Sequence, residues 1–350
     1  MKRILTVTAL AAAVLLAACQ PATTPVDPGG STPTTGLWIN SKEIAALPTS
    51  GPAWSAMHSA ATSSWGTPTI ADQNSKADTN TLAGALVAVR TNDAAMKTKV
   101  RSQLMALAAN HPYDRVLALS RELPSYVIAA DLVGLDSGQR ATFEKFLREA
   151  MTHKMDGHSG GTDLVSTALL SPNNWGTMAR AAAAAVYVYL GDDAGLAKIA
   201  DTQEAWLGGN APNTLKYSST NWHAGSPKKG INARGASRDG HSLDGVIPED
   251  QRRTGEYTWP APKGSYPHEA LQGAIVTSVI LDRAGALPFD AGDKALERAE
   301  RWLVTTNANP PASDDGNTPW LLVKYGSGSF ARSASATAGK NIAWAAWTAA

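Results

Sequence analysis

The residues best suited to chemistry in this chain gather in one segment, 239–270, which reads DGHSLDGVIPEDQRRTGEYTWPAPKGSYPHEA. It interrupts a sequence that is otherwise rich in alanine, and it holds His241, Arg253, Tyr257 and Tyr266. Arginine and protonated histidine stabilise negative charge that develops during a reaction, and tyrosine can give or accept a proton. The segment therefore predicts a site for an anionic ligand.

A second motif, SPNNWGTMA, places Asn173 and Asn174 at the start of a predicted helix. The simplest interpretation is an N-cap, followed by Trp175 as an anchor. In the alternative, the side-chain amide and the free N–H groups of the helix N-terminus face an anion. The residues alone leave both interpretations open.

The order of these motifs resembles the alginate-lyase family of polysaccharide lyases. The shared pattern is an Asn-Asn helix start, then Pro-acid-acid-x-basic-Arg at 248–253, then Tyr-x-x-x-Ala-Leu from Tyr266. This sequence departs from the pattern in two places: Trp175 stands where better-known members have histidine, and the loop between Arg253 and Tyr266 is longer. The resemblance extends from about Asn173 to Ala274 and implies an incomplete α/α toroid.

The resemblance also implies the roles of three residues. Asn174 matches the amide that neutralises a substrate carboxylate, Arg253 the basic residue that assists it, and Tyr266 the catalytic tyrosine. In a uronate polymer the C5 hydrogen lies α to a carboxylate, so β-elimination across C4–C5 requires that charge to be offset first. A tyrosine, with an ordinary pKa near ~10, needs neighbouring cations to act as the base. No cofactor or metal is expected.

Other residues of the two motifs and their loops are expected to bind the substrate. With Trp175 in the usual histidine position, His241 is the best replacement, with a surface-loop histidine as its alternative and His223 as runner-up. Tyr257 competes with Tyr266 for the tyrosine role. Trp222 and Trp259 are either stacking platforms for sugar rings or core anchors. The expected substrate-binding residues are Asn173, Trp175, Trp222, His223, Arg252, Tyr257 and Trp259.

Two rival functions remain open at this point. A glycoside hydrolase would need a pair of carboxyl groups, for which Asp239, Asp244, Glu249 and Asp250 are available. A glycan-binding protein would use the same groove without chemistry. HExxH, GxGxxG and GK[ST] patterns do not occur. The remaining histidines are interpreted as structural or surface residues: His58, His111, His153, His158 and, facing away from Tyr266, His268.

The N-terminus is interpreted as a bacterial lipoprotein leader. Basic residues precede a short apolar run in residues 1–18, and Leu16-Ala17-Ala18-Cys19 resembles a lipobox. Cys19 is the single cysteine of the chain, as lipid attachment alone would require. A Pro- and Thr-rich tether is expected at 19–36 and the lyase domain at 37–350. We expect an exported monomer held on a membrane, on the periplasmic or cell-surface face, through this lipid only.

Composition and pattern favour an all-α fold. The formal net charge is +1, so no overall basic field exists to attract nucleic acid, and the expected partner is an acidic polysaccharide. Alanine and leucine dominate segments that are separated by Gly, Asn, Asp or Pro, which are typical of helices with their start and stop signals. The expected helices cover 81–91, 115–135, 141–154, 176–191, 194–208, 269–285 and 294–306. The region 208–238 is expected to be a long functional loop.

Overall fold

The computed structural model describes residues 36–333, 338–341 and 343–350, all within one compact unit, Ser31–Ala350. The predicted leader (1–18), Cys19 and all of the predicted tether (19–36) except Gly36 lie outside the described residues. Among those residues, no helix combines the length and the apolar character needed to cross a bilayer.

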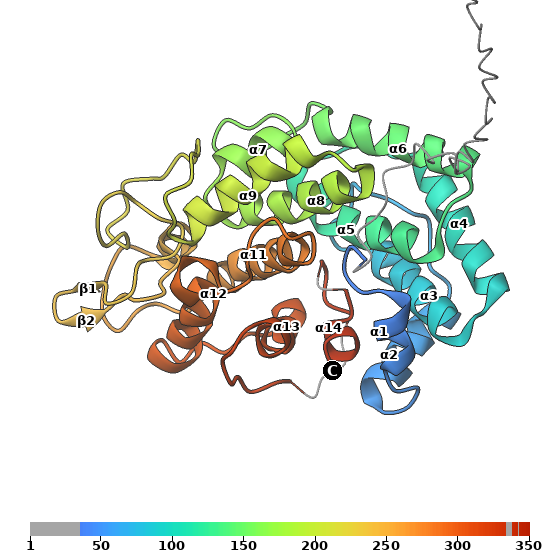
Figure 1. The fold of residues 1–350 in the computed structure, drawn as a ribbon. Coiled ribbons are helices and arrows are strands. Elements are labelled where there is room, and N and C mark those ends of the chain that lie inside the picture. Colours follow the sequence, from blue (N-terminus) through green and yellow to red (C-terminus); the bar gives the residue numbers. More distant parts are fainter. Residues whose placement is uncertain (1–35, 334–337, 342) are drawn as a thin grey trace, which may run out of the picture. The chain divides into compact units, whose positions relative to one another are not determined.

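The described residues form a mostly helical structure, which agrees with the all-α class (Figure 1). The α-helices are α1 (Ser41–Ala46), α2 (Pro52–Thr62), α3 (Ala77–Thr91), α4 (Ala94–Ala109), α5 (Val116–Val133), α6 (Ser137–Thr152), α7 (Leu164–Leu170), α8 (Asn174–Leu190), α9 (Asp193–Leu207), α10 (Pro248–Gln251), α11 (Tyr266–Arg283), α12 (Ala291–Arg301), α13 (Thr318–Tyr325) and α14 (Ala345–Thr348). The two strands are β1 (Ser237–Arg238) and β2 (His241–Ser242), an antiparallel pair. Shorter helical turns are η1 (Arg252–Thr254), η2 (Trp302–Thr306) and η3 (Ser313–Asn317).

The helices fall into an inner and an outer set according to their burial. In α3, α5, α8 and α11 most side chains are buried, and Figure 1 shows these four helices in succession. The helices α4, α6 and α9 pack outside them. The outer helix α6 is amphipathic: it buries Phe143, Phe146, Leu147 and Ala150, and its opposite face is exposed to solvent. The alanine-rich inner helices can pack on several sides because their side chains are small.

Helices α8 and α11 are parallel and approach each other closely. A Cβ on Gly273 would lie 2.6 Å from the backbone nitrogen of Met178, so a larger residue there would push the helices apart. One turn farther along α11, the hydroxyl of Thr277 donates to the carbonyl of Thr177, and nearer the start of both helices the amide of Asn174 donates to Glu269. The N-termini of the two helices therefore lie at the same end, which brings the positive ends of two helix dipoles together.

A buried ionic cluster ties the C-terminal segment to the inner helices. The ammonium of Lys340 lies 2.7 Å from Asp78 of α3 and 3.4 Å from Glu122 of α5. Both carboxyl side chains are fully buried. Burial raises the pKa of Glu122 to about 9; the charge of Lys340 opposes this shift and that of Asp78 adds to it. Burial also raises the pKa of Asp78, against the charge of Lys340. Glu122 therefore stays protonated at neutral pH.

We expect Glu122→Gln to stabilise the protein progressively as the pH rises. Between the ordinary pKa of 4.5 and the folded value of about 9, the folded state holds a proton that the unfolded state has lost. Folding stability therefore falls as pH rises through this window, by up to ~1.4 kcal/mol per pH unit. Glutamine mimics the neutral acid without this loss. Its advantage in the free energy of unfolding should reach roughly 1 kcal/mol or more near pH ~8.5.

Denaturant unfolding across this pH range measures the effect. Glu144→Gln is the matched control, because Glu144 forms a partly exposed pair with Arg140 on α6. Its difference from the native chain should not grow with pH in this way. Parallel stability curves for Glu122→Gln and the native chain would contradict a protonated Glu122.

Candidate functional site

The two asparagines at the start of α8 are buried and have separate partners. Asn173 caps the helix: its Oδ1 accepts from the backbone N–H of Trp175 at 3.2 Å and from the hydroxyl of Ser171 at 3.0 Å. The amide of Asn174 donates to Oε2 of Glu269 at 2.9 Å, and its backbone N–H donates to Oδ1 of Asp250 at 3.0 Å. Asn173 thus fits the N-cap interpretation, whereas Asn174 binds two carboxyl groups.

Arg253 and Tyr266 lie against each other beside this helix start. The guanidinium carbon of Arg253 lies 3.7 Å from the centroid of the Tyr266 ring, in cation-π geometry. Tyr266 is the first residue of α11, and Glu269, which holds Asn174, follows one turn later. The structure therefore gathers the three residues that the family resemblance singles out. We call them the Asn-Arg-Tyr cluster: Asn174, Arg253 and Tyr266.

The charge of Arg253 acts on Asp250, the carboxyl group that accepts a hydrogen bond from the backbone of Asn174. Asp250 is completely buried, and burial raises the pKa of its carboxyl well above the usual range, although the N–H of Asn174 and the charge of Arg253 oppose this. Its Oδ2 has no hydrogen-bond partner among the described residues. Burial therefore favours the uncharged form of Asp250, which leaves the positive charge of Arg253 more available to a ligand.

The neighbouring acid, Glu249, behaves in the opposite way. Burial alone would raise the pKa of its carboxyl, but hydrogen bonds from His223, the N–H of Ser218 and Arg252 outweigh burial and lower it. Nε2 of His223 lies 3.0 Å from Oε1, and Nε of Arg252 lies 3.0 Å from Oε2. His223 and Arg252, both expected to bind substrate, are thus engaged by an ionised Glu249.

The histidine next to the asparagines is His158, not one of the candidates chosen from the sequence. Its Nε2 lies 3.2 Å from the amide nitrogen of Asn173, and its ring centroid lies 5.8 Å from that of Trp175. Burial lowers the pKa of His158, and the charges of Arg252 and Arg253 lower it further. A neutral imidazole therefore stands beside the start of α8. From sequence, His158 is interpreted as a structural or surface residue, so its place beside Asn173 is not expected.

His241 and the loop aromatics form a separate group. The His241 ring stacks on Trp259 with centroids 4.3 Å apart and an interplanar angle of 9°. Tyr257 donates from its hydroxyl to the carbonyl of Arg238 at 3.0 Å and packs edge-on against Trp222. Trp222 is fully buried, and its indole donates to the carbonyl of Gly255 at 2.9 Å. Trp222 therefore fits the core-anchor alternative, whereas His241 and Trp259 are half-buried.

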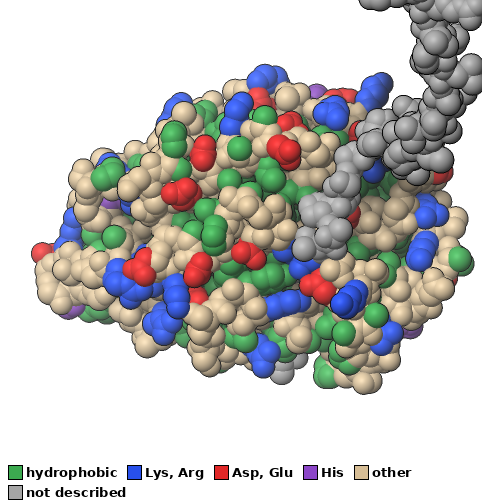
Figure 2. Space-filling view, in the orientation of Figure 1, with side chains coloured by type: hydrophobic (Ala, Val, Ile, Leu, Met, Phe, Trp, Pro, Cys, Tyr) green, Lys and Arg blue, Asp and Glu red, His purple; other side chains and the backbone are tan. Residues whose placement is uncertain are grey.

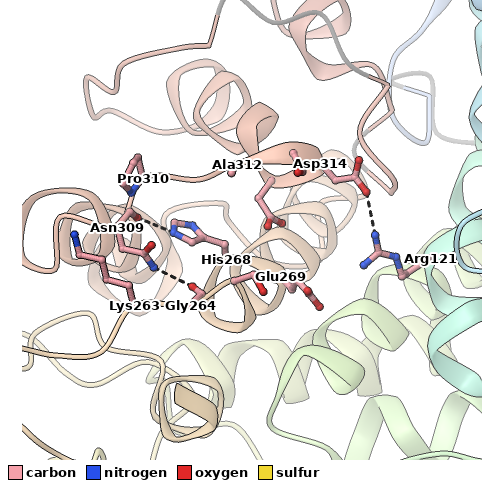
Figure 3. Close-up of a pocket in the computed structure, with 12 residues that line it drawn as sticks. Arg121, Lys263, Gly264, His268, Glu269, Asn309, Pro310, Ala312 and Asp314 are labelled. Atoms are coloured by element: carbon pink, nitrogen blue, oxygen red, sulfur yellow. Dashed lines mark hydrogen bonds and ion pairs between the residues drawn. The ribbon is translucent and has the colours of Figure 1, made fainter. Parts of the chain in front are cut away.

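A pocket of about 490 Å³ adjoins the start of α11 (Figure 3). Glu269, which also holds Asn174, belongs to its wall, so this pocket borders the Asn-Arg-Tyr cluster. His268 lines it as well and shares a hydrogen bond of 2.8 Å with the carbonyl of Asn309. Burial, followed by the charge of Glu269, raises the pKa of Asp315 in this wall well above the usual range.

Charges of both signs are mixed over the molecular face seen in Figure 2, as expected from the small net charge. An anionic polymer would therefore be recognised by local groups. Within the part of the chain that the structure describes, no cluster of three or more His, Cys, Asp or Glu side chains could hold a metal ion.

Comparison of the chain with models of known protein families finds no match, and comparison with curated proteins finds no significant match. The family resemblance therefore depends on the motifs at Asn173–Asn174, 248–253 and Tyr266.

Proposed function

We propose that this protein is a polysaccharide lyase that cleaves a uronate-containing polymer by β-elimination, with alginate as the first candidate substrate and glucuronan or another polyuronate next. The observation that carries the proposal is the stacking of Arg253 on Tyr266 at 3.7 Å, where the N-termini of α8 and α11 converge. A cation, two helix N-termini and a phenol at one place suit a substrate that carries a carboxylate beside an abstractable proton.

In this proposal each member of the Asn-Arg-Tyr cluster has one task. The substrate carboxylate approaches Arg253, which is exposed, and Asn174 exchanges its bond to Glu269 for one to the substrate. Tyr266, as phenolate, removes the C5 proton; the C4–O bond breaks, a C4–C5 double bond forms, and the phenol returns its proton to the departing oxygen. The chain does this as a monomer without an obligatory cofactor.

We also propose that the helices form an incomplete α/α toroid. The division into an inner set (α3, α5, α8 and α11) and an outer set (α4, α6 and α9) supports this arrangement. In such an array the N-termini of parallel inner helices would gather on one face, and that face would carry the site.

One assay tests the function. The folded domain is incubated with a panel of polyuronates while ultraviolet absorbance and reducing ends are followed together. A lyase produces both signals in step, because each cleavage leaves an unsaturated end. Reducing ends without absorbance would instead indicate a hydrolase, and binding without either signal would indicate a glycan-binding protein.

Glycoside hydrolysis is a second candidate because two carboxyl groups with different environments line the pocket beside α11. Burial and the charge of Glu269 raise the pKa of Asp315 well above its usual range, the direction that a general acid requires, while the amide of Asn174 donates to the carboxyl group of Glu269. The four acids considered from sequence fit less well: Glu249 and Asp244 form ion pairs with Arg252 and Arg298, Asp250 is buried, and Asp239 lies in the β1–β2 turn.

We further propose that the protein is exported and anchored to a membrane through a lipid on Cys19. We expect Cys19→Ala to release the protein from the membrane fraction or to leave its leader uncleaved, because this lipid is the proposed anchor. Fractionation of cells that produce each form measures this. Undiminished membrane attachment of the variant would contradict the lipid anchor.

A further inference from the structure

A second pocket, of about 630 Å³, lies beside the first and shares two wall residues with it. Arg121 of α5 and Asp314 of η3 line both pockets. The rest of the second wall offers hydroxyl and amide groups, including Gln73 and Asn74, and the exposed cation Lys76. Lys340 also lines it and is paired with Asp78. Among the described residues that line this pocket, Asp314 is the only acidic one. The second pocket is therefore suited to an anionic, hydroxyl-rich ligand.

An ion pair separates the two pockets. Nη2 of Arg121 lies 3.0 Å from Oδ2 of Asp314, and Figure 3 shows this bond crossing from α5 to the loop that carries Asp314. The Arg121 side chain is only 15% exposed, and its Nε has no hydrogen-bond partner among the described residues. The Asp314 side chain is 41% exposed. Arg121 therefore has an unused Nε–H donor for a carboxylate, and the displaced Asp314 carboxylate would be solvated.

We propose that the Arg121–Asp314 pair is an exchangeable partition: a uronate carboxylate of the polymer replaces Asp314 on Arg121, and the two pockets become one groove. The inference rests on the proposed function, because it takes the substrate to be a polyuronate. It adds a second carboxylate-binding position at Arg121, away from the Asn-Arg-Tyr cluster.

The exchange is chemically balanced. Arginine binds one carboxylate before and one after, and the incoming group can use the unpaired Nε in a two-pronged contact. An ion pair with a partly exposed member is weak, so a ligand can displace it. Of the other acids in the first pocket, Asp315 is buried, which raises the pKa of its carboxyl and favours the neutral form. Displacement of Asp314 thus removes a negative charge that would repel the polymer.

Two substitutions should change polymer binding in opposite directions. Asp314→Asn removes the competing carboxylate and should tighten the binding of hexa- to octauronates by roughly tenfold. Arg121→Gln removes the cation and should weaken their binding by roughly tenfold or more. Di- and trisaccharides that occupy one pocket should respond less to either change. A merely structural ion pair would instead make both variants bind less tightly.

The test measures dissociation constants by calorimetry in the Tyr266→Phe background and KM values with Tyr266 present, over a series of oligouronate lengths. Asp293→Asn is the matched control, because Asp293 pairs with the exposed Arg234, away from both pockets; it should change nothing. Carboxyl-reduced oligomers should be insensitive to all three substitutions.

Dissociation constants that shift in opposite directions in the two variants, and more for long than for short oligouronates, would support the partition. Equal effects on short and long oligouronates, or weakened binding in both variants, would overturn it while unsaturated products still supported the lyase. If no oligouronate binds and none is cleaved, the partition and the proposed function both fail.

Discussion

Replacing Tyr266 with phenylalanine should abolish turnover and leave polymer binding intact. The substitution removes only the phenolic oxygen, so the ring stays at the start of α11 and the guanidinium of Arg253 can still stack on it. Tyr266 is half-buried, and its hydroxyl is not needed to build this contact. If the phenol transfers the C5 proton, its loss should lower kcat by about 10²- to 10⁴-fold. The initial rate of absorbance increase measures this change.

Tyr257→Phe is the matched control, since it removes the same group from the neighbouring loop. The Tyr257 hydroxyl donates to the carbonyl of Arg238, so this variant should lose about 1 kcal/mol of stability but keep its activity. An inactive Tyr257→Phe beside a working Tyr266→Phe would transfer the role to Tyr257. Full activity in both variants would reject tyrosine chemistry, and the pocket acids Glu269 and Asp315 would then be the next residues to replace.

The helices that sequence predicted best are those in which small apolar residues are dense. The structure has a helix in each of the seven predicted segments, including α8 and α11. It also has α4, which was not predicted: Val100, Leu104 and Leu107 are its only buried residues, set among lysine, arginine and glutamine. The last predicted segment, 294–306, changes character along its length, because α12 passes into the π-type turn η2 at Trp302. Its apolar spacing does not encode that change.

The candidate site was predictable only for residues that belong to local sequence motifs. The motifs lead to Asn174, Arg253 and Tyr266, which the fold brings together. Glu269 and His158 could not be chosen from local spacing: Glu269 meets Asn174 across 95 positions of sequence, through the packing of α8 on α11. The stacking of His241 on Trp259 likewise depends on how β2 and the loop that carries Trp259 fold onto each other. The role of His241 in the reaction stays a prediction.

Replacing Arg253 with alanine should cost about 10²-fold or more in kcat/KM while the fold remains. Arg253 is exposed, and its contact with the Tyr266 ring is a surface cation-π pair that stabilises the fold by ~1 kcal/mol or less. Its charge should matter far more to the substrate carboxylate, which gains negative charge as the C5 proton leaves. Kinetics with the preferred polyuronate and thermal unfolding of the same sample separate the two effects.

Arg252→Ala supplies the contrast, because Arg252 is held by the buried Glu249 and not by the ring of Tyr266. We expect it to lose more stability and less activity than Arg253→Ala. NMR titration adds an independent readout: the charge of Arg253 lowers the pKa of His158, so Arg253→Ala should move that pKa upward. A rise in the His158 pKa without loss of activity would show that Arg253 acts on the site but not on the substrate. Unfolding of Arg253→Ala, or a larger activity loss in Arg252→Ala, would place the carboxylate-binding cation elsewhere.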